Sequence, residues 1–196
     1  MNAPDSGEQD ACDMASLNAG QDAALNAIMD RHGQRLYHYL LRQLDNEIEA
    51  ADFAQETFVR VYLHRARFDP AQKFSTWLYT IATNLLRDRF RWRQRHPQVS
   101  LDAEGEESCA LKDALPDGAA LPSEQSETHE RAEAVRAAVA GLPGDLRTAL
   151  ILSAYEGQQH AQIATVLNCT TKAVESRLYR ARALLRQRLK GLLQNG

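Results

Sequence analysis

The stretch from Phe74 to Arg95, FSTWLYTIATNLLRDRFRWRQR, constrains the fold more than any other part of the chain. Its apolar residues recur at steps of three and four, which predicts one amphipathic helix with Ser75 as its N-cap. These apolar positions are Phe74, Trp77, Leu78, Ile81, Ala82, Leu85 and Leu86. The other side carries polar and basic residues at the same spacing, namely Thr80, Asn84, Arg87 and Arg91. The helix should therefore bury one face and present an amide and arginines outward.

Arginines become dense toward the end of this stretch. They occupy every second position from Arg87 to Arg95, with Phe90 and Trp92 between them. Arginine beside exposed aromatic rings suits phosphates together with unstacked bases. Taken alone, the run would be interpreted as a solvated basic helix end. A second basic helix at the far end of the chain favours contact with a nucleic acid instead.

The formal net charge of −3 hides an uneven distribution of charge. The first thirty residues contain acidic residues and no Lys or Arg. Residues 60–96 carry nine Lys or Arg against two acidic residues, and residues 170–190 carry seven against one. Two basic blocks in an acidic chain indicate two contacts with one polyanion.

Composition narrows the fold and the chemistry of the 196-residue chain. Leu, Ala, Arg, Glu and Gln dominate while β-branched residues and glycine are sparse, which favours an all-α fold. The three cysteines are far apart and the histidines form no HExxH or comparable ligand pair, so we expect neither a disulfide framework nor a metal site. No apolar run approaches the roughly 20 residues of a membrane span. The acidic N-terminus is not a secretory signal, so we expect no membrane insertion and a cytoplasmic location.

The chain divides into four parts by pattern. Residues 1–20 are small, polar and acidic, and we expect a disordered arm there. Residues 21–97 and 126–196 have helical periodicity and predict two small helical domains. Between them, residues 98–125 are acidic and interrupted by proline and glycine, which indicates a flexible linker. That linker could serve as a spacer or as an anionic strand that occupies a basic channel in a partner.

Residues 47–65 predict a helix with one strongly polar face. That face holds Asp52, Gln55, Glu56 and Arg60. Asp52 and Glu56 could form a catalytic carboxylate pair, but no His, Ser or Cys nucleophile accompanies them. We therefore expect no enzyme activity, and a solvated face or a protein-docking face instead.

The segment from Gln159 to Tyr179 has the spacing of a helix-turn-helix. A small residue, Ala164, would lie where two helices touch, and Asn168 would take the left-handed turn conformation. Thr170 can cap the second helix. The outward residues of that helix are Thr171, Lys172, Glu175, Ser176, Tyr179, Arg180 and Arg182. This pattern predicts insertion into the major groove of duplex DNA.

In combination these features resemble a group 4 (extracytoplasmic-function, ECF) sigma factor of bacterial RNA polymerase, a branch of the sigma-70 family. The resemblance extends from about Gln21 to Leu193. Its first half is carried by residues 52–62 (DFAQETFVRVY), 74–79 (FSTWLY), Ile81, Ala82, Asn84 and Asp88. Its second half is carried by Leu142, Pro143, Arg147, Gly157, Ile163, Ala164, Leu167 and 174–182 (VESRLYRAR). Departures are the longer acidic N-terminal arm and Tyr62, where the family often has Trp.

The resemblance implies that residues 21–97 form the domain called sigma-2 and residues 126–196 the domain called sigma-4. In the family, the helix matching Asp52, Gln55, Glu56 and Arg60 docks on the clamp coiled coil of the β′ subunit. The sigma-4 domain binds the β flap, and the linker runs through the active-site cleft. The family needs no cofactor and has no catalytic residues, and anti-sigma factors hold many of its members.

Promoter recognition is also implied by the resemblance. The segment matching Phe74 to Arg91 melts and reads the −10 element, with Asn84 at the pocket for a base flipped from the non-template strand. The contact residues would be Trp77, Tyr79, Thr80, Asn84, Arg87 and Arg91. The helix-turn-helix would bind the −35 element as duplex. An alternative is a helix-turn-helix regulator with a helical N-terminal sensor domain, which explains the second half of the chain but not the aromatic-arginine helix.

Overall fold

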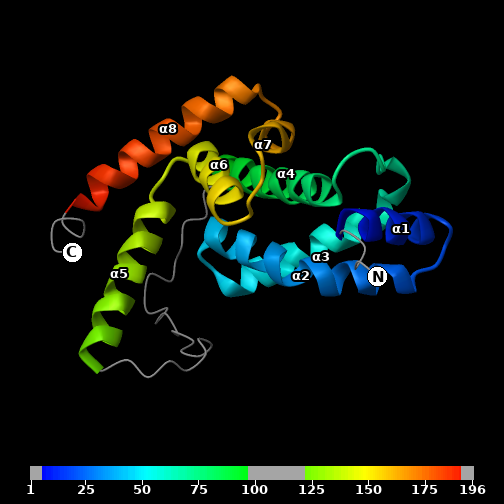
Figure 1. Ribbon diagram of the computed structural model, residues 1–196, viewed down its shortest axis with the longest axis horizontal. Helices are drawn as coiled ribbons and strands as arrows, with labels where there is room; N and C mark the ends of the chain where they lie inside the picture. The colour runs from blue at the N-terminus through cyan, green and yellow to red at the C-terminus, as the bar shows by residue number, and fades with distance from the viewer. Residues whose placement is uncertain (1–5, 97–121, 191–196) are drawn as a thin grey trace.

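The computed structural model describes residues 6–96 and 122–190, and these form eight α-helices and one short 3-10 helix (Figure 1). The helices are α1 (Ser6–Asn18), α2 (Ala23–Leu44), α3 (Glu47–Leu63), η1 (Arg65–Arg67), α4 (Phe74–Arg95), α5 (Pro122–Ala140), α6 (Gly144–Ala154), α7 (His160–Leu167) and α8 (Thr171–Arg188). No strand occurs in these two ranges, so the predicted all-α fold is confirmed.

Helices α2, α3 and α4 pack together as the first helical group. Asp45 ends α2 in the left-handed region at a φ of 54°, and Asn46 caps α3 by accepting a hydrogen bond of 2.9 Å from the Glu49 amide. The predicted apolar stripe of α4 is buried at Phe74, Leu78, Ala82, Leu85 and Leu86. The predicted N-cap was wrong, because Lys73 precedes the helix and Ser75 lies in its first turn.

The N-terminal arm differs from its prediction. Residues 6–18 form α1 rather than a disordered segment, and α1 packs on α2. Met14 and Leu17, three residues apart, are buried, and Arg31 of α2 pairs with Asp10 at 2.7 Å. Burial of these two apolar side chains and the ion pair offset the entropy that ordering an acidic segment costs.

The second helical group contains the helix-turn-helix. Asn168, between α7 and α8, has a φ of 50°, and the Thr170 hydroxyl accepts a hydrogen bond of 3.2 Å from the Ala173 amide. Both local predictions are therefore confirmed. Buried Ile163, Val174 and Leu178 join α7 and α8 to α6.

The region predicted as a linker, residues 98–125, lies mostly outside the described residues. The described chain resumes at Pro122, where α5 begins, so the last four predicted linker positions belong to a helix. The two roles considered for the linker, spacer and channel-filling strand, concern residues that the structure does not describe.

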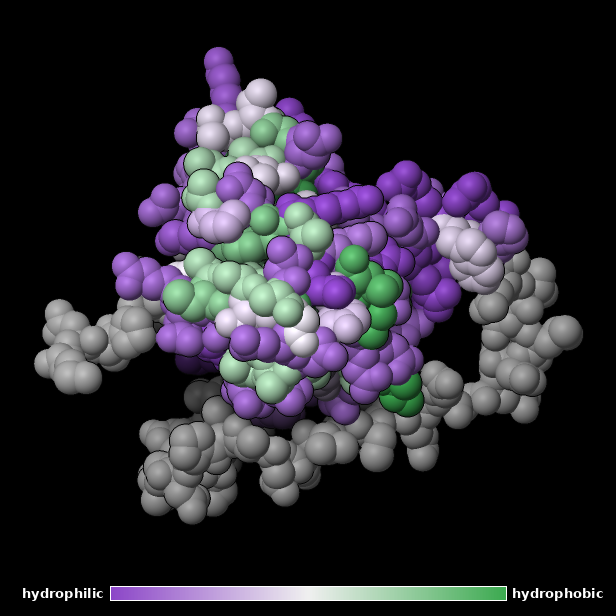
Figure 2. Space-filling model, turned by 90° about the vertical axis from the view of Figure 1, so that its right-hand side faces the viewer, coloured by the Kyte–Doolittle hydropathy of each residue, from purple (hydrophilic) through white to green (hydrophobic). Residues whose placement is uncertain are grey.

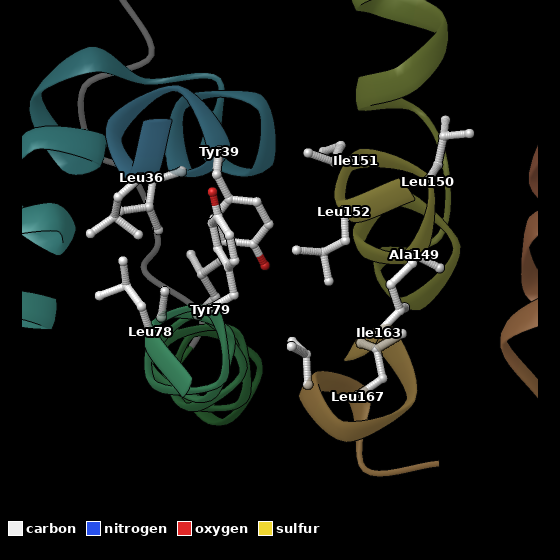
Figure 3. Close-up of a cluster of buried hydrophobic side chains, with 14 of the residues drawn as sticks. Leu36, Tyr39, Leu78, Tyr79, Ala149, Leu150, Ile151, Leu152, Ile163 and Leu167 are labelled. Carbon is white, nitrogen blue, oxygen red and sulfur yellow. The ribbon is translucent and has the colours of Figure 1, made fainter. Parts of the chain in front are cut away.

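The two helical groups are in contact with each other. Helix α7 packs on α4 and α6 packs on α2, and buried side chains from both groups form one apolar cluster. Figure 3 shows Tyr39 and Tyr79, from α2 and α4, facing Leu152 of α6 and the α7 residues Ile163 and Leu167. The two groups therefore share one apolar core in this arrangement.

Candidate nucleic-acid and polymerase interfaces

The outer side of α3 combines charge with exposed apolar side chains. Asp52, Gln55 and Glu56 are exposed, and Arg60 is half-buried with its Nε 3.0 Å from a Glu56 carboxylate oxygen. Exposed apolar side chains from the same helix lie among them, namely Ile48, Val59 and Leu63. We call these seven residues the docking face. A mixture of acidic and large apolar groups on a rigid helix suits a protein partner better than a nucleic acid.

The polar side of α4 is open at two of its predicted DNA contacts. Asn84 and Arg91 are exposed, and Arg91 lies 3.2 Å from the Asp88 carboxylate. Thr80 is half-buried and donates a hydrogen bond of 2.8 Å to the carbonyl of Thr76. An exposed amide and an exposed arginine on one helix can contact a base edge and a phosphate of the same strand.

Trp77 packs against two other aromatic rings. Its ring centroid lies 5.3 Å from that of Phe68 and 6.1 Å from that of Phe74, and the side chain is only half-buried. A ring packed on one side and partly open on the other can stack on a base. Toward the end of α4, Phe90 and Trp92 are also partly exposed among the arginines.

Tyr79 and Arg87 do not lie on the open face of α4. Tyr79 is 3% exposed, and its hydroxyl donates a hydrogen bond of 2.5 Å to Glu156. Burial and the Glu156 carboxylate raise the pKa of the Tyr79 hydroxyl. Arg87 donates to the carbonyl of Leu167 at 3.3 Å and lies 3.7 Å from Asp145. The structure thus separates these two predicted DNA contacts from Asn84 and Arg91 and places them at the contact between the helical groups.

Polar contacts that sequence reasoning did not predict complete the surface between the two helical groups. Gln43 donates to the Thr148 hydroxyl at 3.1 Å, and Arg147 donates to the Gln43 carbonyl at 2.8 Å. Arg35 donates to the Glu156 carbonyl at 3.0 Å, and burial lowers the pKa of Arg147. No local pattern marks these residues, because each partner lies about a hundred positions away in the chain.

All seven predicted contact residues of the second helix, α8, are exposed. These are Thr171, Lys172, Glu175, Ser176, Tyr179, Arg180 and Arg182. Tyr179 is 75% exposed, although it is a large aromatic residue. Arg177 points the other way and anchors α8 to α6 through Asp145 at 3.0 Å. The helix therefore presents an unobstructed, mainly basic face of the kind that enters a major groove.

Glu175 has a neighbour that the sequence pattern did not suggest. Its carboxylate lies 3.8 Å from Nδ1 of His160, the first residue of α7. Both side chains line a shallow hollow on α8 together with Leu178, Tyr179, Arg182 and Arg186.

The described ranges contain neither a metal site nor a membrane-spanning helix. No group of three or more His, Cys, Asp or Glu side chains there could hold a metal ion. No helix there is long and apolar enough to cross a membrane. On the face shown in Figure 2, hydrophobic residues lie in separate patches among hydrophilic ones.

Known proteins resemble the chain over almost its whole length. Sigma-70 region 2 matches residues 28–96, and sigma-70 region 4 matches residues 132–185. The chain is 34% identical to the ECF RNA polymerase sigma factor SigW of Bacillus subtilis, over 90% of this chain and 94% of SigW. It is also 34% identical to the RNA polymerase sigma-H factor of Pseudomonas aeruginosa, over 95% and 97% of the two chains.

Solved structures show the same relationship. The structure of CnrH in complex with the cytosolic domain of CnrY matches with a TM-score of 0.67 and 26% identity, over 93% of this chain and 98% of CnrH. The match to region 2 accounts for the helices that a regulator would use as a sensor domain, so that alternative is set aside. The chain belongs to the ECF subfamily, group 4, of the sigma-70 family of RNA polymerase sigma factors.

Proposed function

We propose that the two halves of this sigma factor divide promoter recognition between them. The sigma-2 domain, whose DNA-facing helix is α4, would melt and read the −10 element. The sigma-4 domain, whose recognition helix is α8, would bind the −35 element as duplex. The docking face of α3 would hold the β′ clamp of core polymerase, and sigma-4 would lie on the β flap. A sigma factor is an initiation factor and not an enzyme, so Asp52 and Glu56 need no catalytic partner.

The observation that carries this proposal is the pairing of two different DNA-binding surfaces in one chain. On α4, a half-buried Trp77 and an exposed Asn84 suit a base that has left the stack. On α8, an exposed row of polar and basic side chains suits base edges and phosphates of intact duplex. A chain that opens one element and reads another as duplex needs both kinds of surface.

The contact between the domains has to open for both elements to be bound together. Elements centred at −10 and −35 are about 25 base pairs apart, which is roughly 85 Å of B-DNA at 3.4 Å per base pair. In this structure α7 packs directly on α4, and Arg87 is tied to Leu167. We propose that docking on core polymerase separates the domains and frees Tyr79 and Arg87 for the −10 element.

An anti-sigma factor is a further proposed partner. CnrH, which this chain matches over both domains, was solved in complex with the cytosolic domain of CnrY, and the sigma factor RpoE of Bartonella quintana in complex with the anti-sigma factor NepR. A partner of this class that contacted both domains at once would favour the closed arrangement, because it would tie the domains together.

The experiment that tests the proposal is run-off transcription with purified core polymerase on genomic fragments, followed by mapping of the start sites. The expected result is initiation downstream of a shared pair of −10 and −35 sequences, only when the chain is present. Asn84→Ala should lower permanganate reactivity of the opened strand and weaken base preference at one −10 position. Specific binding to duplex DNA without core polymerase, and no transcription with it, would reject the proposal.

A further inference from the structure

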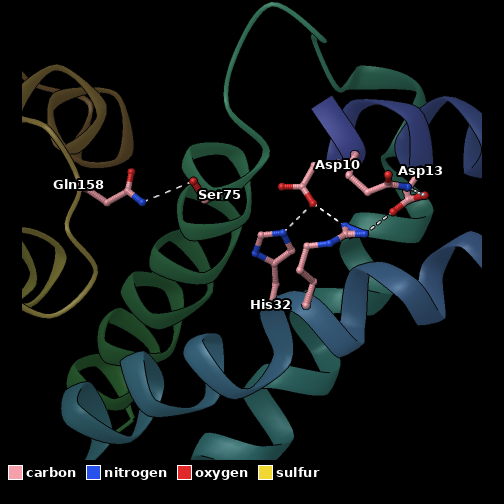
Figure 4. Close-up of polar contacts among 7 residues, drawn as sticks. Asp10, Asp13, His32, Ser75 and Gln158 are labelled. Carbon is pink, nitrogen blue, oxygen red and sulfur yellow. Dashed lines mark hydrogen bonds and ion pairs between the residues drawn. The ribbon is translucent and has the colours of Figure 1, made fainter. Parts of the chain in front are cut away.

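Helix α1 is attached to the sigma-2 domain through a buried carboxylate. Asp10 is 4% exposed, and one of its oxygens accepts hydrogen bonds from Arg31 at 2.7 Å and from His32 at 2.8 Å (Figure 4). Burial alone would raise the pKa of Asp10, but hydrogen bonds and charges from His32 and Arg31 lower it below its usual value. The Asp10 carboxylate is therefore a fixed acceptor that sets the orientation of the His32 ring.

His32 carries this constraint to the start of α4. Its ring centroid lies 5.0 Å from that of Phe74, which is itself 2% exposed. Phe74 contacts Phe68 at 5.8 Å and Trp77 at 6.1 Å between ring centroids. Helix α1 also packs against η1 and α4 directly. A continuous series of packed rings therefore joins α1 to Trp77.

We propose that Asp10 is a positioning residue for base recognition at the −10 element, acting through His32 and Phe74 on the ring of Trp77. The inference rests on the proposed function of Trp77 and Asn84 as a base pocket. Close-packed rings have few alternative orientations, so loss of the Asp10 contact lets His32 turn and Phe74 shift. A recognition pocket tolerates displacements of only about half an ångström, so small shifts of Trp77 blur the choice of base.

Asp13 provides a matched control on the same helix. It is also acidic and it also pairs with Arg31, whereas the carboxylate that pairs with His32 is that of Asp10. If α1 acted only as a clamp on α2, removal of either carboxylate would have similar consequences. If Asp10 acts through His32, only its removal changes base recognition.

The test uses holoenzyme reconstituted from core polymerase and the full chain, with variants Asp10→Ala, Asp13→Ala and His32→Gln. Transcription is scored on one promoter library randomised across the −10 element and another randomised across the −35 element. Asp10→Ala and His32→Gln should relax preference at the base position read by Asn84 by roughly fivefold or more. The −35 profile and core affinity should stay unchanged. Asp13→Ala should match wild type, and Asp10→Asn, which keeps the acceptor oxygen, should restore most of the preference.

Three outcomes would overturn the inference, and thermal unfolding establishes first that each variant is folded. A folded Asp10→Ala variant with a wild-type −10 profile would show that α1 only stabilises the domain. If Asp13→Ala and Asp10→Ala relaxed the base preference equally, Asp10 would not act through His32. If Trp77→Ala and Asn84→Ala also leave the profile unchanged, the proposed base pocket fails together with the inference. If those two variants relax the profile and Asp10→Ala does not, only the inference fails.

Discussion

Tyr79 of α4 donates a 2.5 Å hydrogen bond to the carboxylate of Glu156, a residue 77 positions later that is itself only 5% exposed. The pair joins the sigma-2 and sigma-4 domains at the centre of their contact. Nε of Arg35 lies 3.4 Å from Oε2 of the same carboxylate, and Arg35 also donates a hydrogen bond to the Glu156 backbone carbonyl. This buried acid keeps its hydroxyl and guanidinium partners only while the domains are together, because Glu156 belongs to sigma-4 and both partners belong to sigma-2.

Replacement of Glu156 should therefore shift the two domains toward separation. Glu156→Ala leaves the Tyr79 hydroxyl buried without an acceptor, which costs the closed arrangement about 1 to 3 kcal/mol. We expect a larger radius of gyration in small-angle X-ray scattering and faster amide exchange in α6 and α7. Glu133→Ala is the control, since Glu133 is exposed and pairs with His129 on its own helix. An unchanged scattering profile for Glu156→Ala would show that the apolar contact alone holds the domains together.

Charge reversal on the docking face of α3 should weaken binding to core polymerase. Asp52→Arg combined with Glu56→Arg removes two exposed acids and sets Arg60 beside a like charge. Exposed charges contribute little to folding, so thermal unfolding should change by only a few degrees. The amount of the variant that co-purifies with core polymerase should fall by about tenfold or more, because like charges placed across an interface repel each other. Asp30→Arg, an exposed reversal on α2, should bind core normally; retention of core by the double variant would place the interface elsewhere.

Local patterns in the sequence were sufficient for some parts of this fold. The stripe of α4, the turn at Asn168 and the cap at Thr170 depend on neighbours within a few positions, and all were confirmed. Helix α1 was not predicted, because Met14 and Leu17 are isolated apolar residues in an acidic segment. Their burial depends on the surface of α2, which no periodicity within α1 reveals.

The predicted contact residues on α4 show the same difference between positions set by local spacing and positions set by contacts with distant residues. Spacing placed Asn84 and Arg91 correctly on an open face of the helix. The resemblance to sigma factors assigned Tyr79 to DNA, whereas here it faces Glu156 of the other domain. A pairing across 77 residues leaves no trace in local spacing, and a tyrosine suits either environment.

Tyr39 should make the sigma-2 domain sensitive to alkaline pH. Burial raises the pKa of Tyr39 to about 12, and its hydroxyl lies 2.7 Å from that of Thr83. Because the folded pKa lies above the unfolded value near 10, its contribution to stability is complete below pH 10 and is lost between pH 10 and 12. The part of this loss that Tyr39 causes should be about 2 to 3 kcal/mol in the free energy of unfolding measured with urea.

The comparison that isolates Tyr39 is Tyr39→Phe. At neutral pH the free energy of unfolding of this variant should be about 1 kcal/mol lower, because the hydrogen bond is lost. Above pH 10 its free energy of unfolding should decrease less steeply than that of the wild type. Tyr179→Phe, at an exposed position, should follow the wild-type curve. Parallel curves for Tyr39→Phe and wild type would mean that other groups cause the alkaline loss.

Glu175 is the lone acid on the outward face of a basic recognition helix, one turn from its start. A glutamate that faced phosphates would be repelled, so its position has to be explained by another partner. His160, 3.8 Å away on α7, is one such partner within the domain. Cytosine is the other, because its N4 amino group donates to a carboxylate in the major groove. Glu175 can reach either partner from α8. A measurement of base preference in the −35 element distinguishes the two.

If Glu175 reads a base, Glu175→Gln should relax preference at one base pair of the −35 element by roughly 1 to 3 kcal/mol and leave the other positions unchanged. Arg182→Ala should instead weaken all promoters to a similar degree and reduce the salt dependence by about one phosphate contact. His160→Gln separates the two partners of Glu175, since it removes the neighbouring imidazole but leaves the Glu175 carboxylate in the chain. Transcription scored on a library randomised across the −35 element measures all three variants together. A Glu175→Gln profile that falls uniformly, matched by His160→Gln, would assign Glu175 to the contact between α7 and α8 and not to the base.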